Sequence, residues 1–139
     1  MYNLKIHLNK YCFIYAPIVG TIIMIILEYF NVTDSLADTS LKYEVIGIAG
    51  TLAGFLLTIY VMFYSLNQNT EYIKKLSRHK HIKIFTNCVI YGMIFLVTDI
   101  FLVFINIPEI IVKLLFMCGL SELICTMYYI FVISTHNQN

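Results

Sequence analysis

Four long runs of apolar residues dominate the chain, and short polar segments separate them. The period-two alternation typical of membrane β-barrels is absent. A helix needs roughly 20 mostly apolar residues to cross a bilayer, and four runs reach that length. These runs are 11–30, 45–66, 84–107 and 109–134. The pattern predicts an all-α, polytopic membrane protein with four transmembrane helices, folded as a single transmembrane domain over residues 1–139.

The composition supports a membrane protein. Of the 139 residues, 60% are hydrophobic and 12% are charged, whereas soluble domains usually carry about 25% charged residues. A short chain cannot hide so much apolar surface in water, because small domains keep a large share of their surface exposed. The net charge of +1 provides no basic field, so we expect no direct nucleic-acid binding.

Positive charges in the polar segments predict the orientation. Lys5 and Lys10 precede the first run, which we interpret as a retained span rather than a signal peptide because its apolar stretch is long. The loop 67–83 holds a second basic cluster. Its members are Lys74, Lys75, Arg78, Lys80 and Lys83. Because Lys and Arg stay on the cytoplasmic side, we predict that this loop and both termini are cytoplasmic.

The same basic loop has two interpretations. Tyr72, Ile73 and Leu76 fall at near-helical spacing among the cations, which is typical of an amphipathic helix on the membrane surface. The cations would then bind anionic lipid headgroups. Alternatively, the loop is a docking surface for a cytoplasmic protein partner or another anionic partner.

A stripe of small residues runs along the second span. Gly47, Gly50, Gly54 and Thr58 fall at i, i+3, i+7 and i+11, on one face of a helix. Helices in lipid associate through close backbone approach and interhelical hydrogen bonds, which such a G-x-x-x-G face permits. We therefore expect this helix to make the closest helix contact, either within one subunit or between subunits.

Ionisable residues inside spans are costly unless they are paired, neutralised or hydrated, so each is a candidate functional site. Asp99 lies in the third span and Lys113 near the start of the fourth, at similar depth when counted from the turn at Pro108. One interpretation is an intramembrane ion pair between the two. The other is a role in an ion pathway.

Glu122 lies near the middle of the fourth span, with no basic residue at matching depth. Several semi-polar side chains share its helical face. These are Cys118, Cys125, Thr126 and Tyr129. The stripe is a candidate pore lining at an oligomer axis. Alternatively, Glu122 is protonated and hydrogen-bonded to a neighbouring helix.

Motifs for catalysis, metal binding and cofactor binding are missing. The four cysteines, which include Cys12 and Cys88, lie in apolar runs without a C-x-x-C pair, and we interpret them as small apolar residues. The chain has no phosphate-binding glycine loop, no G-x-S-x-G and no H-E-x-x-H. We expect neither metal nor cofactor, and no enzymatic activity.

Two segments resemble small four-span membrane proteins of bacterial anti-phage defence systems, such as the membrane subunit of the Kiwa system. They are AGTLAGFLLT at 49–58 and SLNQNTEYIKKL at 65–76. The resemblance implies an inner-membrane subunit that senses infection or permeabilises the membrane, as a homo-oligomer such as a tetramer, beside a cytoplasmic partner. The alternatives are a non-conducting scaffold that tethers a cytoplasmic effector, and a small proton-coupled transporter.

Overall fold

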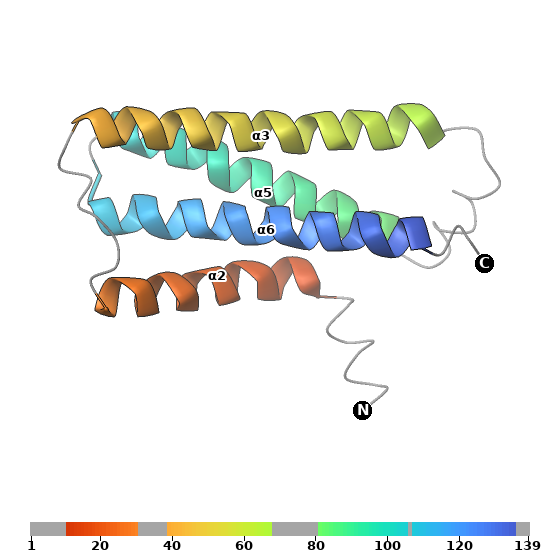
Figure 1. Cartoon of the computed structure of the whole chain (residues 1–139), viewed down its shortest axis with the longest axis horizontal. Helices are drawn as coiled ribbons and strands as arrows, with labels where there is room; N and C mark the ends of the chain where they lie inside the picture. Colours follow the sequence, from red (N-terminus) through yellow and green to blue (C-terminus); the bar gives the residue numbers. More distant parts are fainter. Residues whose placement is uncertain (1–10, 31–38, 68–80, 106, 136–139) are drawn as a thin grey trace.

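The computed structural model describes residues 11–30, 39–67, 81–105 and 107–135. These residues form four helices and no strand: α2 (Cys12–Tyr29), α3 (Thr39–Asn67), α5 (His81–Phe104) and α6 (Glu109–Thr135) (Figure 1). All four are long and apolar enough to cross a membrane. The expected all-helical protein with four spans is therefore confirmed, while the orientation of its termini stays a prediction.

The helices form a bundle in which neighbours run antiparallel (Figure 1). α6 packs against α2 and α5, and α3 packs mainly against α5. The start of α2 and the end of α6 therefore lie at the same end of the bundle, together with the end of α3 and the start of α5. α5 and α6 each pack against two other helices, which explains why polar residues on both of them can be buried.

Two prolines mark local departures from regular helix. Pro17 lies inside α2 and has no N–H group of its own to donate. Its carbonyl oxygen accepts a hydrogen bond from Thr21 Oγ1 at 2.9 Å and one from Cys118 Sγ of α6 at 3.6 Å. The bond from Cys118 ties the proline turn to α6, whereas the carbonyl freed by the missing N–H is that of Phe13, four residues earlier.

The second proline, Pro108, separates α5 from α6. The apolar run predicted a span to residue 107, but the helix ends at Phe104, and the backbone N–H of Ile107 then donates to Leu102 O at 3.4 Å. Residues just before a proline avoid the helical conformation. The hairpin between α5 and α6 is therefore short, and the two helices pack along much of their length.

The core lies where α3, α5 and α6 meet. Its fully buried members from these helices include Ala49, Leu56, Phe85, Leu96 and Tyr129. Ring contacts extend the core toward the end of α3, since Phe63 and Phe85 have centroids 4.7 Å apart. Large apolar side chains also cover the outside of the bundle, which is the arrangement that lipid requires.

The closest helix contacts involve glycines other than those of the predicted stripe. A Cβ atom on Gly119 of α6 would lie 2.7 Å from the Leu96 side chain, and one on Gly92 of α5 would lie 3.0 Å from Leu56 Cδ1. Apart from the backbone of its own helix, no atom of the described residues lies within 4 Å of such a Cβ on Gly47 or Gly54. The prediction that the stripe packs closely within one subunit is therefore wrong.

The structure shows why the glycine stripe of α3 makes no close contact with another helix. α3 contacts α5 through Ala49, Ala53 and Leu56, which lie on a different side of the helix. Gly50 alone approaches α5, with its Cβ position 3.9 Å from Ile100 Cδ1. The alternative contact between subunits stays a prediction, and it would use the exposed side of α3.

Candidate functional site

Glu122 lies on the side of α6 that faces α5, and it is fully buried. Gly92 of α5 lies opposite, because a Cβ atom added there would be 3.1 Å from Glu122 Cβ. The missing side chain at Gly92 leaves room for the carboxyl group between the two helices. A bulkier residue at that position would push α5 away from the acid.

Buried polar and polarisable side chains surround this carboxyl group. The thiol of Cys88 in α5 lies beside it, and Thr126 and Tyr129 of α6 are also buried nearby on the same helix. The Thr126 hydroxyl donates to the backbone oxygen of Glu122 at 2.9 Å. Neither carboxyl oxygen of Glu122 has a hydrogen-bond partner among the described residues.

The predicted polar stripe of α6 faces the interior of the bundle. All five members are buried: Cys118, Glu122, Cys125, Thr126 and Tyr129. A pore at an oligomer axis would need them on an outer face, so that prediction is wrong. The physical reason is that α2 and α5 cover the two sides of α6 that carry the stripe. The alternative, a protonated Glu122 hydrogen-bonded to a neighbouring helix, stays a prediction, and Cys88 of α5 is the side chain close enough to take part.

Two of the cysteines also depart from the sequence-based interpretation, because they are bonded to each other. Cys12, the first residue of α2, forms a disulfide with Cys125 of α6, so these two are not simply small apolar residues. Cys118 lies further along the same helix contact, where its sulfur is 3.4 Å from Thr21 Oγ1. The α2–α6 contact thus contains a covalent link that no local motif indicates.

Asp99 lies on α5, also fully buried, and neither of its carboxyl oxygens has a hydrogen-bond partner among the described residues. The predicted ion pair with Lys113 is therefore wrong. Lys113 lies one helical turn before Met117, the residue that touches Gly20 of α2. It consequently faces α2 rather than α5.

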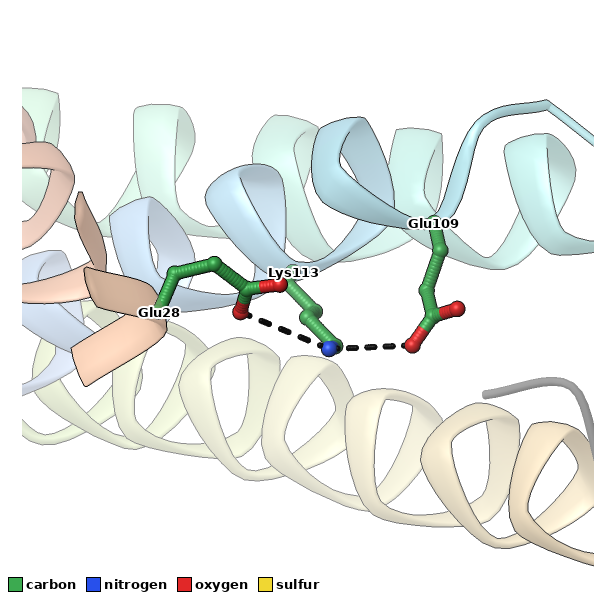
Figure 2. Close-up of polar contacts among 3 residues, drawn as sticks. All are labelled: Glu28, Glu109 and Lys113. Atoms are coloured by element: carbon green, nitrogen blue, oxygen red, sulfur yellow. Dashed lines mark hydrogen bonds and ion pairs between the residues drawn. The ribbon is translucent and has the colours of Figure 1, made fainter. Parts of the chain in front are cut away.

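Lys113 pairs with two other carboxylates (Figure 2). Its Nζ lies 2.9 Å from Glu109 Oε1 on its own helix and 3.5 Å from Glu28 Oε2 at the end of α2. Figure 2 shows the amine between the two acids. These three residues mark the end of the bundle near the α5–α6 hairpin.

Asp99 and Glu122 occupy different levels of the bundle. Gly92 is level with Glu122, and Asp99 follows seven residues later on α5 (99 − 92 = 7). At 1.5 Å of rise per residue, the two carboxyls are separated by about 10 Å along the axis. Asp99 lies toward the end that carries Lys113. The ionisable groups are therefore spaced along the bundle.

Other predicted site residues lie at the surface or outside the described part. Gly47, Gly54 and Thr58 are exposed, and Lys83 is exposed on α5. The remaining cations of the basic loop lie outside the described residues: Lys74, Lys75, Arg78 and Lys80. Within the described segments, no three His, Cys, Asp or Glu side chains gather where they could hold a metal ion.

Comparison of the chain with protein-family models, with curated proteins and with solved structures finds no match. The site must therefore be interpreted from its own chemistry. That chemistry is two buried carboxyl groups at different depths, one of them beside a thiol and next to a disulfide.

Proposed function

We propose that the chain is a membrane protein that lets protons cross the bilayer through the interior of its own helix bundle. Asp99 and Glu122 are the proton-binding groups in this proposal. The observation that carries it is the full burial of both carboxyls without a hydrogen-bond partner in the described residues. A polar group buried in this way is destabilising, and an ionisable group inside a span points to function.

The spacing of the groups supports a stepwise path. Protonation removes the charge of a carboxyl and makes its burial in apolar surroundings tolerable. A proton would bind at Glu122, pass to Asp99 over about 10 Å with the help of transient water, and leave at the end that holds Lys113. Glu28 and Glu109 beside that lysine are partly exposed and can accept it.

This proposal moves the pathway from an oligomer axis to the inside of each protomer. It retains the expectation that the protein perturbs the membrane, because a proton leak lowers the membrane potential. It also includes the proton-coupled transporter as a limiting case. A transporter would move protons only with its substrate, whereas a leak needs none.

Proton flux into liposomes tests the proposal. Purified protein is reconstituted with a potassium gradient, valinomycin sets the potential, and an internal dye reports pH. We expect Asp99→Asn and Glu122→Gln each to lower the flux at least about tenfold, the scale of a lost proton-transfer group. Glu44→Gln is the matched control, because Glu44 is an exposed carboxylate on α3. Wild-type flux equal to that of empty liposomes, both with and without dithiothreitol, would overturn the proposal.

Self-association is a second part of the proposal. The face of α3 that carries Gly47 and Gly54 is exposed, and Thr51 and Thr58 on it donate to the carbonyl oxygens of these glycines at 2.8 Å. A face of small residues with internally satisfied hydroxyls allows another helix to approach closely. We propose that copies of the chain associate through it.

The proposed setting is anti-phage defence in the bacterial inner membrane, with a cytoplasmic partner at the basic loop 67–83. Its support is the resemblance of residues 49–58 and 65–76 to small membrane proteins of such systems. Charge reversal at Lys74, Lys75 and Arg78 should then abolish co-purification of the partner. If charge reversal abolishes co-purification and the wild type conducts no protons, the non-conducting scaffold is favoured instead.

A further inference from the structure

α2 is held to the rest of the bundle at three levels. At its start, Cys12 is covalently linked to Cys125. In the middle, the position of a Cβ on Gly20 is 2.7 Å from Met117 O. At its end, Glu28 pairs with Lys113 at 3.5 Å. Only the first of these is covalent, and it lies at the level of Glu122.

The first turn of α2 covers the junction between α5 and α6 beside this acid. Cys125 follows Glu122 by three residues, so the disulfide lies about one helical turn from the carboxyl group. On the α5 side, the ring of Phe13 stacks on Tyr91, with centroids 5.7 Å apart and planes 6° apart. Tyr91 directly precedes Gly92, the residue opposite Glu122. The disulfide and the stacked rings therefore flank the acid on both helices.

Near Cys12, the other contacts of α2 are weaker than the disulfide. The Glu28–Lys113 pair lies at the far end, and the Glu28 side chain is 39% exposed, so it adds little to stability. The contact at Gly20 lies eight residues from Cys12 (20 − 12 = 8). Nearer to Cys12, the long hydrogen bond from Cys118 Sγ to the carbonyl oxygen of Pro17 at 3.6 Å also links α2 to α6, and Phe13 packs the first turn against the core.

We propose that the Cys12–Cys125 disulfide is a redox-sensitive clasp, which a dithiol reductant opens to release the first turn of α2 and uncover Glu122. Where it concerns proton flux, this inference rests on the proposed function. The predicted orientation places Cys12 at the cytoplasmic end of its span. Disulfides exposed to the cytoplasm are usually transient and redox-sensing, because cytosolic dithiols reduce them.

The reaction is a thiol–disulfide exchange. A thiolate of the reductant attacks Sγ of Cys12, which is partly exposed, and the bond to the buried Cys125 sulfur breaks. The second thiol of the reductant then attacks its own mixed disulfide and releases Cys12. Two electrons and two protons pass from the dithiol to the two cysteines, and the reductant leaves as a disulfide.

The accessibility of Glu122 tests the clasp directly. Full-length protein in liposomes, oxidised or reduced with dithiothreitol, is treated with dicyclohexylcarbodiimide, which modifies carboxyl groups within membranes. Mass spectrometry of the peptide that contains Glu122 measures the modification. Since reactivity follows the fraction of open molecules, we expect about a tenfold rise on reduction. Modification of Asp99, about 10 Å further along the bundle, should change little and is the internal reference.

Variants provide the controls. Cys12→Ser combined with Cys125→Ser should give high modification without reductant. Cys118→Ser keeps the clasp and should respond to reductant as the wild type does. Glu122→Gln should abolish the signal at this peptide. If the double serine variant does not fold, the comparison of oxidised and reduced wild type still decides the question.

The outcomes separate the clasp from the proposed function. Equal modification of Glu122 in oxidised and reduced protein overturns the clasp, whatever the proton flux. Free thiols at Cys12 and Cys125 after oxidation also overturn it. A rise in modification on reduction in liposomes that show no proton flux supports the clasp and refutes the proton pathway.

Discussion

A Cβ atom on Gly20 of α2 would lie 2.7 Å from the backbone oxygen of Met117 in α6. The two helices therefore touch through their backbones, and a carbonyl group inside a helix cannot rotate away. We expect Gly20→Ala to separate α2 from α6 and to lower the free energy of unfolding by about 1–3 kcal/mol. The midpoint of thermal unfolding in detergent measures this change.

Gly54→Ala is the matched control for that substitution. Beyond the backbone of its own helix, no atom in the described segments lies within 4 Å of a Cβ placed on Gly54, and alanine favours a helix over glycine by roughly 0.5–1 kcal/mol. The midpoint should therefore stay equal or rise. Equal loss of stability in the two variants would contradict the assignment of Gly20 to a close helix crossing.

These glycines show how much of the packing the sequence predicts. The four spans follow from apolar runs of sufficient length, because that property is local. The contacts between spans depend on which faces meet. Gly47, Gly50 and Gly54 form the regular pattern, yet the close crossings use single glycines on three different helices: Gly20, Gly92 and Gly119.

The candidate site, too, has features that the sequence predicts and features that it does not. Asp99 and Glu122 stand out in the sequence because ionisable residues are rare in spans. Their surroundings do not follow from the sequence. Lys113 pairs with Glu28 and Glu109 rather than with Asp99, because the rotation of α6 decides which helix it faces. The disulfide joins residues 113 positions apart, and equal depth in the bilayer follows from helix packing rather than from spacing in the chain.

Asp99→Asn separates a functional role of this acid from a structural one. The substitution keeps the shape and removes the ionisable group, and the wild-type carboxyl accepts no hydrogen bond from the described residues that could be lost. We expect the unfolding midpoint to be unchanged or higher while the proton flux falls. A clearly lower midpoint would instead indicate that Asp99 stabilises the fold.

The Lys113 cluster is expected to link α2 to α6 only weakly. The Lys113 amine is 2.9 Å from Glu109 and 3.5 Å from Glu28, and both carboxylates are partly exposed. A double-mutant cycle with Lys113→Met and Glu28→Gln should give a coupling energy of about 0.2–1 kcal/mol. The midpoints of the three variants provide it.

A second double-mutant cycle, with Lys113→Met and Glu109→Gln, provides the comparison. This pair lies within one helix at i and i+4. It should give a coupling energy of about 0.3–0.5 kcal/mol. A coupling to Glu28 of several kcal/mol would contradict this picture and would make the ion pair a main attachment of α2.

The exposed face of α3 leads to a prediction about assembly. Gly54→Leu adds bulk where no other described helix has an atom within 4 Å of the Cβ position, so the fold of one subunit should be unaffected. Energy transfer between labelled copies in liposomes should fall if this face forms the contact. Val97→Leu is the control, because Val97 is exposed on α5. Equal energy transfer in both variants would place the contact elsewhere.

The packing of α2 on α6 has a consequence for how the protein is made. Chains are synthesised from the N-terminus, so α2 enters the membrane before α6, the helix that holds its disulfide partner, its backbone contact and its ion pair. Until α6 is synthesised, α2 therefore lies in the bilayer without the helix that it mainly packs against. A ribosome that stops before α6 leaves a nascent product with this surface open to quality-control proteases. Among the four described helices, the one that inserts earliest thus depends for its assembly on the one that inserts latest.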